Sequence, residues 1–241
     1  MKYAVLGDIH ANLEALTACL EDCEKQSVEK YLCIGDIVGY NANPSECLEI
    51  VRKLDCAGIV MGNHDEQAAE ETELVGFNPQ AAFAIEWTRK HLAEEQRKYL
   101  GSLRLSIQLG KITIVHATLD SPRRWGYIFD KHSAGASFSY QFSQICFCGH
   151  SHVPLAFEKF GTIQGGKYKE IRVQPGHKYL VNVGSVGQPR DGDWRAAYVL
   201  FDTEENMVHL MRVPYDLKTA QDKIIKAGLP ERLAVRLERG A

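Results

Sequence analysis

The chain has 241 residues, of which 45% are apolar, and 28 basic against 31 acidic residues give a formal net charge of −3. This balance argues against nucleic acid as a partner, because a sequence-independent nucleic-acid binder carries a strong basic excess. A chain of this length buries enough surface to fold without disulfides or structural zinc. Its seven cysteines, an odd number in mostly apolar surroundings, are expected to be reduced core residues.

The beginning of the chain shows no pattern of a secretion signal. Met1 and Lys2 lead directly into a short apolar run that ends at Gly7-Asp8. No stretch approaches the ~18 apolar residues that a membrane-spanning helix needs. We therefore expect a soluble cytoplasmic protein with no membrane partner.

The first 65 residues alternate between strand and helix patterns. A helix is predicted over residues 11–26, where apolar residues recur every three or four positions. A second helix is predicted to begin at Pro44, with Asn43 as its cap. Three short apolar runs are predicted to be buried strands: Tyr3–Leu6, Tyr31–Ile34 and Ile59–Met61. Strands separated by helices indicate a parallel sheet.

The middle of the chain is predicted to be helical over 78–100, followed by two strands within 104–116 that are joined at Gly110-Lys111. Residues of about 120–143 are rich in Arg, Ser and aromatic residues and are expected to form an irregular surface excursion. Six further strands are predicted, all short and joined by turns that contain glycine: Ile145–Cys148, Leu155–Phe160, Lys169–Val173, Tyr179–Val183, Ala196–Phe201 and Val208–Val213.

The C-terminal tail, about 215–241, returns to helical spacing. Its apolar residues can pack inside the same chain or against a second copy, so a homo-oligomer stays open; they are Leu229, Leu233, Val235 and Leu237. No composition break marks a second domain. We therefore expect one domain over 1–241, with the excursion and the tail as its appendages.

Two weaker patterns are set aside. The stretch from Gly161 to Lys167 nearly matches a phosphate-binding loop, but Tyr168 stands where Ser or Thr is required, and a hairpin turn is the better interpretation. Cys146 and Cys148 fall on one face of a predicted strand, where apolar neighbours and the lack of a second pair favour core packing over a zinc or redox site.

Polar residues follow the predicted strands where each strand ends. In an open parallel sheet this edge is where ligands bind. These residues comprise carboxylates, an amide and five of the nine histidines: Asp8, His10, Asp36, Asn63, His64, Asp65, His116, His150 and His152. A single histidine after a strand is usually a loop residue, but this many donors along one edge indicate a common site.

This donor set fits two metal ions better than one. It holds more carboxylates and imidazoles than one tetrahedral zinc needs, and its mixture of oxygen and nitrogen suits Mn, Fe, Zn or Co better than Mg or Ca. Two cations held ~3.5–4 Å apart require a bridging anion. Asp36 lies centrally enough in the chain order to serve as that anion.

These residues resemble the calcineurin-like metallophosphoesterase family. Asp8-x-His10, Gly35-Asp36, Gly62-Asn63-His64-Asp65, His116 and Gly149-His150-x-His152 stand in the family's order, and Asn12 and the segment 182–190 resemble its small bacterial branch. The resemblance implies an α/β (α+β) fold, a four-layer αββα sandwich with two central mixed β-sheets. It covers the chain to about residue 201.

The resemblance also implies roles for individual residues. One metal is expected on Asp8, His10, Asp36 and His152, and the second on Asp36, Asn63, His116 and His150. Catalytic roles are implied for two residues outside these sets: His64 would contact the phosphoryl oxygens or protonate the leaving group, and Asp65 would orient it. The expected reaction is attack of a metal-bridging hydroxide on a phosphomonoester or phosphodiester, with Mn, Fe or Zn as the ions.

The substrate is less defined by the sequence. A small, nucleotide-like phosphate ester is favoured, with six candidate contact residues: Asn12, Arg123, Arg124, Trp125, Gln188 and Arg190. Tyr127 of the same excursion could stack on the substrate beside Trp125. Arg190 is equally well interpreted as a surface arginine, and Trp125 and Tyr127 as anchors of their loop to the core. The alternative function is a protein-interaction scaffold on the same fold with little or no catalysis.

Overall fold

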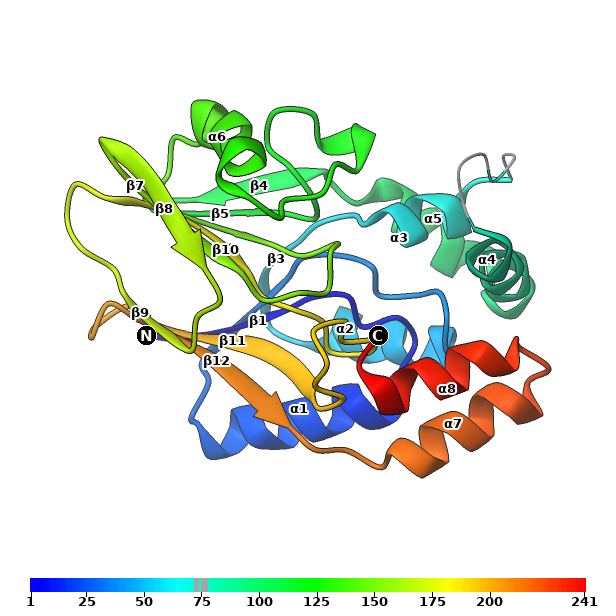
Figure 1. Cartoon of the computed structure of the whole chain (residues 1–241). Helices are drawn as coiled ribbons and strands as arrows, with labels where there is room; N and C mark the ends of the chain where they lie inside the picture. Colours follow the sequence, from blue (N-terminus) through cyan, green and yellow to red (C-terminus); the bar gives the residue numbers. More distant parts are fainter. Residues whose placement is uncertain (72–73, 75–77) are drawn as a thin grey trace.

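The computed structural model describes residues 1–71, 74 and 78–241, which build two mixed β-sheets with helices on their outer faces (Figure 1). The first sheet has the order β3-β2-β1-β11-β12-β9. Its strands are β1 (Lys2–Leu6), β2 (Lys30–Cys33), β3 (Cys56–Ile59), β9 (Glu170–Arg172), β11 (Ala196–Asp202) and β12 (Met207–Val213). Strand β1 runs parallel to β2 and antiparallel to β11, so the predicted parallel unit lies beside antiparallel strands.

The second sheet has the order β4-β5-β6-β10-β7-β8. Its strands are β4 (Ser106–Leu109), β5 (Ile112–Val115), β6 (Ile145–Cys148), β7 (Ala156–Phe160), β8 (Thr162–Gly166) and β10 (Lys178–Asn182). Strand β6 lies parallel to both β5 and β10, whereas β7 is antiparallel to β10. The parallel group β5-β6-β10 mirrors the group β3-β2-β1 of the first sheet.

The core lies in three apolar layers. Between the sheets, Val5, Leu32 and Val199 of the first sheet share a buried cluster with Phe147 and Val181 of the second. Alternate residues of a strand point to opposite faces, so each sheet has a second apolar face for its helices. The arrangement is the expected four-layer αββα sandwich.

Helices cover the two outer faces unequally (Figure 1). The apolar cluster on the first sheet's side includes residues of α1 (Leu13–Lys25), α2 (Pro44–Lys53), α3 (Asn63–Ala69), α4 (Pro79–His91), α5 (Glu94–Ser102), α7 (Leu217–Lys226) and α8 (Glu231–Arg239). Helix α6 (Lys131–Tyr140) packs on the second sheet. Leu229, Leu233 and Leu237 of the C-terminal tail are buried in the first-sheet cluster, so this part of the tail packs within its own chain.

Several element boundaries differ from the prediction. The third strand was expected at Ile59–Met61, but β3 spans Cys56–Ile59. It ends earlier because the chain leaves the sheet after Ile59 and begins α3 at Asn63. The helical region 78–100 is two helices, because Leu92 and Ala93 are extended and Gln96 caps the new helix by accepting from the Ala93 N–H at 3.1 Å.

The surface excursion at 120–143 is more regular than expected. A short 3₁₀ turn spans Pro122–Arg124, and α6 follows, capped by the Asp130 carboxylate, which accepts from the Ser133 N–H at 2.9 Å. The weak hydrophobic pattern of α6 hid this helix. The stretch interpreted as a hairpin turn at Gly161 forms that turn, and strand β8 follows it and pairs with β7.

All seven cysteines are free thiols and six are buried, as expected. Cys146 and Cys148 pack in the apolar cluster beneath α6. Among the helices of the described residues, none combines the length and the hydropathy that crossing a bilayer requires.

Candidate metal centre

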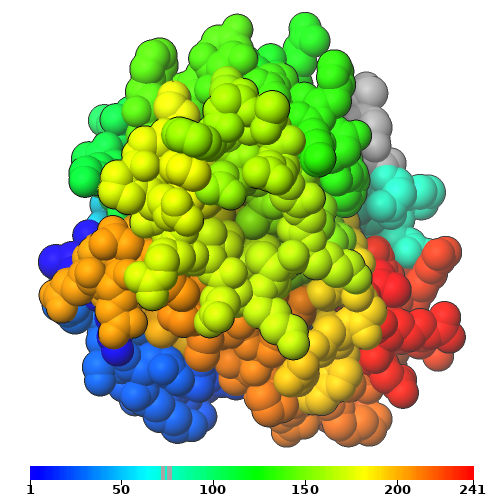
Figure 2. Space-filling model, turned by 60° about the vertical axis from the view of Figure 1, so that its left-hand side comes forward, coloured from blue at the N-terminus to red at the C-terminus, as the bar shows by residue number. Residues whose placement is uncertain are grey.

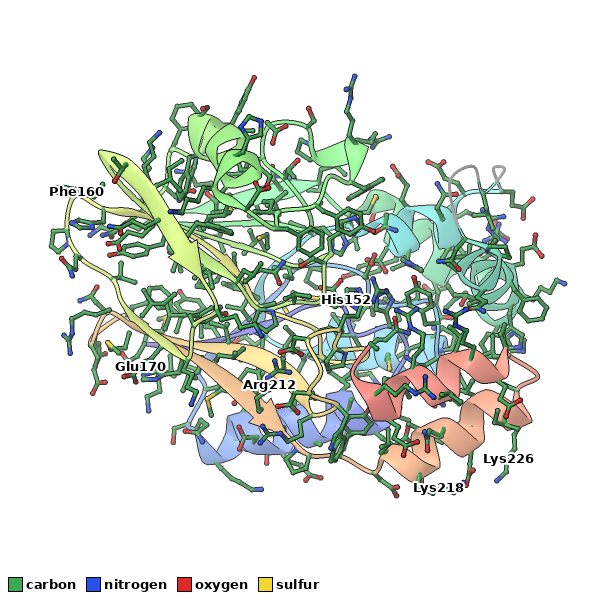
Figure 3. All side chains as sticks on the ribbon, in the orientation of Figure 1. His152, Phe160, Glu170, Arg212, Lys218 and Lys226 are labelled. Carbon is green, nitrogen blue, oxygen red and sulfur yellow. The ribbon has the colours of Figure 1, made fainter. Side chains whose placement is uncertain are left out.

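The candidate ligands meet where the parallel strands of both sheets end. Asp8 and His10 follow β1, Asp36 follows β2, His116 follows β5, and His150 and His152 follow β6. All six are at least nine-tenths buried. Figure 3 places His152 in the interior of the molecule, far from labelled surface residues such as Phe160 and Lys218.

The ligand atoms form two groups that share one residue. In the first group, one atom from each of Asp8, His10, Asp36 and His152 lies within 4.8 Å of all the others. In the second, the same holds for Asp36, His116 and His150. The two predicted ligand sets are thus brought together around Asp36.

Backbone carbonyls orient three of the four imidazoles. The Nδ1 atoms of His10, His116 and His152 lie 3.1, 2.8 and 2.6 Å from the carbonyl oxygens of Val38, Ile34 and Gln188. A carbonyl only accepts, so each Nδ1 carries the proton in this arrangement, and each Nε2 of a neutral ring presents its lone pair. Metal-binding histidines are commonly held in this way.

The contact between His10 and His152 points to a cation. Their Nε2 atoms lie 3.1 Å apart, and burial holds the pKa of each ring well below its ordinary value. With both Nδ1 atoms protonated, two neutral rings place lone pair against lone pair. A shared cation removes this repulsion, so the geometry fits a metal.

Asp36 is the centre of the charge distribution. Its Oδ1 accepts from the His64 N–H at 2.8 Å, and its Oδ2 lies 3.5 Å from His10 Nε2 and 3.3 Å from His116 Nε2. Burial opposes its ionisation, but His116 and His64 hold the pKa of Asp36 well below its usual range. A Cβ at position 62 would lie 2.1 Å from Asp36 Oδ1, so glycine there leaves room for this carboxylate.

The second group also contains a ligand atom that has no hydrogen-bond partner among the described residues. His150 Nε2 is buried without a hydrogen-bond partner in the described part of the chain. His116 Nε2 lies 3.2 Å from Asn63 Oδ1, so the amide predicted as a ligand is beside the second group. An orphaned imidazole nitrogen next to amide and carboxylate oxygens is the mixed set that Mn, Fe and Zn accept.

The protonation of the two carboxylates depends on their neighbours. Burial raises the pKa of Asp8, and the negative charge of Asp36 adds to this, while His116 opposes it. Burial also disfavours the charge on His116, but Asp36 more than offsets this and raises the pKa of His116 to about 9. The cluster therefore takes up protons that a bound cation has to displace.

His64 and Asp65 occupy different positions from the ligands. His64 lies against His10 and Tyr40, with ring centroids 4.7 and 4.5 Å away, and burial lowers its pKa to about 4. The Asp65 carboxylate accepts from the N–H groups of Ile37 and Gly62 at 2.9 and 3.0 Å, and so ties the loop after β2 to the start of α3. The expected action of Asp65 on the His64 ring stays a prediction.

A pocket of about 290 Å³ opens onto both ligand groups. Asp36, Asn63, His64, His150 and His152 line its floor and wall. Its other lining residues are Tyr40, Asn78, Ala81, Trp125, Tyr127 and Arg190. The metal cluster, His64 and an aromatic wall thus face the same space.

Two of the six expected substrate contacts line this pocket. Trp125 is held by its Nε1–H, which donates to Glu66 Oε2 at 3.1 Å. Arg190 donates to Gln188 Oε1 at 2.9 Å, and its guanidinium carbon lies 5.7 Å from the centre of the Tyr40 ring. Both side chains stay predicted substrate contacts.

The other four lie differently. Asn12 is buried: its Oδ1 accepts from the Ala15 N–H and its Nδ2 donates to the Gly187 carbonyl, so it caps α1. Gln188 is also buried and supports His152 and Arg190. We therefore expect supporting roles for these two in place of direct contact. Arg123 and Arg124 are exposed, and Arg123 lies 3.4 Å from Glu66.

Two further aromatic residues line the pocket, of which sequence reasoning named Tyr127 and missed Tyr40. Tyr127 stacks on His150 with centroids 4.3 Å apart and an interplanar angle of 19°. Tyr40 meets the edge of His10 at 4.6 Å. Tyr127 stood out as part of the aromatic excursion, but Tyr40 follows Gly39 in a loop whose path the sequence does not indicate.

Most of the chain matches the model of a known protein family. The model of the calcineurin-like phosphoesterase superfamily domain matches residues 1–206. The chain belongs to this family.

Related proteins extend the similarity over the whole chain. The uncharacterized protein MJ0912 of Methanocaldococcus jannaschii is 42% identical, covering 98% of this chain and 97% of its own length. The crystal structure of a metallophosphoesterase from Sphaerobacter thermophilus is 38% identical with a TM-score of 0.88, covering 100% and 99% of the two chains. The hypothetical protein PH1004 from Pyrococcus horikoshii OT3 shares the fold at 22% identity, with a TM-score of 0.80 and coverage of 100% and 98%.

Proposed function

We propose that this metallophosphoesterase hydrolyses a small phosphate ester with the help of two transition-metal ions. The observation that carries this proposal is the pair of buried ligand groups that share Asp36 and open onto one pocket. A structural cluster would have no need of a pocket, whereas a catalytic one must admit substrate.

The two ions are assigned to the residues of the two groups. Asp8, His10 and His152 would hold one ion, His116 and His150 with Asn63 would hold the other, and Asp36 would serve both. When bound, ions such as Mn, Fe or Zn polarise phosphoryl oxygens and lower the pKa of water toward about 7.

His64 is the proposed acid for the leaving group. Its ring lines the pocket beside Asn63 and Asp36 without belonging to either ligand group. A positioned imidazole that gives a proton to the departing oxygen contributes roughly 10²–10⁴ in rate. Because burial lowers the pKa of His64 to about 4, the ring would take up this proton when the negative charge of a bound phosphate ester favours its charged form. The two neighbouring rings and the backbone bond to Asp36 keep its place fixed.

The remaining pocket residues favour a small substrate with an aromatic or planar group. Arg190 offers a planar fork that matches phosphoryl oxygens. Trp125 and Tyr127 form an aromatic wall, and stacking on such a wall is worth ~1–3 kcal/mol per base. A pocket of about 290 Å³ suits a nucleotide-like molecule, with monoesters and diesters both open.

Hydrolysis of p-nitrophenyl phosphate and bis-p-nitrophenyl phosphate by the Mn²⁺-loaded protein tests the proposal. We expect turnover of at least one ester, abolished in Asp36→Asn. Absence of turnover with metals shown to be bound would contradict it and favour a protein-interaction scaffold. The comparison of the two esters also decides between monoesterase and diesterase preference.

We also propose a single domain in a reducing, cytoplasmic setting. The C-terminal helices share a buried cluster with the first sheet, which supports one domain. Seven free thiols support the reducing compartment.

A further inference from the structure

A second cavity, of about 650 Å³, lies beside the metal pocket. It is lined by the start of α4 and by one face of α8. Asn78, which caps α4 by accepting from the N–H groups of Gln80 and Ala81, lines both cavities. The two spaces are therefore neighbours across one residue, and the positive end of the α4 dipole lies between them.

The face that α8 turns to this cavity is cationic. Arg232, Arg236 and Arg239 follow at intervals of four and three residues, which places them on one side of the helix. The opposite side buries Leu233 and Leu237 in the core. The packing of the leucines thus fixes the direction in which the arginines point.

Among the described residues, these arginines lack the acidic side-chain partners that other arginines of the chain have. Arg52, Arg97, Arg195 and Arg212 each pair with a carboxylate. Within the described ranges, no side-chain carboxylate lies within 4.0 Å of a guanidinium nitrogen of Arg190, Arg232, Arg236 or Arg239. Arg236 Nε donates at 2.6 Å to the main-chain oxygen of Ala241, the last residue of the sequence, so the excess positive charge is that of Arg190, Arg232 and Arg239.

The cationic face is continuous with the metal pocket. Burial lowers the pKa of Arg236, and the nearby positive charges of Arg190 and Arg232 lower it further. Arg190 lines the metal pocket, so its charge acts both on that pocket and on Arg236 of α8. The end of α8 is tied to the loop that carries Arg190, because the Gly192 N–H donates to the Gly240 carbonyl at 2.9 Å. Figure 2 shows the C-terminal segment in red beside that loop in gold.

Like charges held together with too few counter-charges cost free energy that a bound anion recovers. We propose that the arginine face of α8 is an anion subsite for a second phosphoryl group of the substrate, whose first phosphoryl group lies in the metal pocket. This inference rests on the proposed function. The substrate class is then a small molecule with two phosphoryl groups, a bisphosphate or a polyphosphate ester, since guanidinium groups bind phosphoryl oxygens through paired hydrogen bonds.

Binding without turnover is the first test. Linear alkane-α,ω-bisphosphonates of increasing length are titrated calorimetrically into the Mn²⁺-loaded protein, beside the alkylphosphonates that carry one such group. A bisphosphonate has two equivalent ends, so it binds somewhat more tightly than an alkylphosphonate for statistical reasons alone. At the best length, and after correction for this factor, it is expected to bind at least about tenfold more tightly than the alkylphosphonate. Arg236→Gln and the exposed Arg232→Gln should each reduce this ratio. Arg172→Gln, an exposed arginine on β9, is the matched control and should retain it.

Kinetics on the matching esters is the second test. The ratio of kcat/KM for the diol bisphosphate to that for the alkyl monophosphate should fall in Arg236→Gln and Arg232→Gln. Thermal melting of each variant verifies that it folds. Equal affinities for the mono- and bisphosphonates in the wild type, or a ratio unchanged in both α8 variants, would overturn the subsite. If the bisphosphonate is preferred but no ester is hydrolysed, the subsite stands and the proposed hydrolysis fails.

Discussion

Replacement of Asp36 by asparagine tests whether one carboxylate serves both ligand groups. The substitution keeps the size of the side chain and removes its charge. An amide can still accept from the His64 N–H through its oxygen. Its nitrogen then takes the place of Asp36 Oδ2, which lies 3.5 Å from His10 Nε2 and 3.3 Å from His116 Nε2. A donor replaces an acceptor at the point that both ions need, so both should be lost.

The magnitude can be read as a thermal shift. A ligand present at 100 times its dissociation constant stabilises a protein by about 2.7 kcal/mol, so two occupied sites contribute ~5 kcal/mol. For a chain of this size each kcal/mol moves the Tm by roughly 2–4 °C. The wild type should therefore melt about 10–20 °C higher with Mn²⁺ than with a chelator. Asp36→Asn should show almost none of this difference.

In the chelated state the same variant should be less stable than the wild type. His116 and His64 hold the pKa of Asp36 well below its usual range, so its charge stabilises the fold, and its removal leaves His116 without this partner. Relief of the repulsion between Asp36 and Asp8 offsets only part of this loss. The metal-dependent difference, measured for each protein against itself, separates these effects.

The assay combines differential scanning calorimetry with elemental analysis after gel filtration. Asp202→Asn is the control, because Asp202 is also buried but accepts from the Glu204 N–H at the end of β11, a bond that asparagine can retain. The control should keep two ions and the full shift. Two ions retained by Asp36→Asn, or one lost and one kept, would refute the shared carboxylate.

Three further predictions concern catalysis, pH and the aromatic wall. His64→Ala should retain both metals and lose ~10²–10⁴ in turnover of alkyl phosphates, but less with nitrophenyl esters, whose leaving group needs no proton; equal losses on both would contradict the acid role. In chelated protein the pKa of His116 is about 9 against an ordinary 6.5, so its stabilising charge is complete below about pH 6.5 and is lost as the pH rises through 9. Urea unfolding should show a decrease of up to about 3 kcal/mol across this interval that is absent in His116→Gln. Trp125→Phe removes the donation to Glu66 and should raise KM by roughly tenfold with kcat nearly unchanged; a fall in kcat alone would place Trp125 closer to the reacting atoms.

The fold was predictable where local pattern and tertiary environment agree. Strand β6 has the predicted bounds, because four consecutive apolar residues are too short a run for a buried helix and fit a strand buried on both faces. The break at Leu92–Ala93 was not predictable, because both residues suit a helix and Gln96 stops it through a hydrogen bond that spacing does not reveal. Helix α6 depends on the Asp130 cap more than on an apolar stripe.

The candidate site was predictable for a different reason. Its ligands are few, polar and placed at strand ends, so a short pattern names them without knowledge of packing. The pocket wall has no such pattern: Tyr40 and Tyr127 are brought to the histidines by loops from opposite sheets. The same holds for the supporting carbonyls of Ile34, Val38 and Gln188, because any residue provides a carbonyl.

The glycines beside the ligands explain why so short a pattern is informative. Asp8, His10, Asp36, His150 and His152 all have positive φ, between 49° and 66°, a conformation that costs about 1–3 kcal/mol for a residue with a side chain. The loops adopt it because they pack against one another: a Cβ at Gly149 would lie 2.2 Å from Asp8 Oδ2, and the His150 N–H donates to that carboxylate at 3.1 Å. The glycine of one loop thus makes room for the ligand of another. Because Gly62 makes room for Asp36 in the same way, substitution of Gly62 or Gly149 should disturb a candidate ligand that follows a different strand.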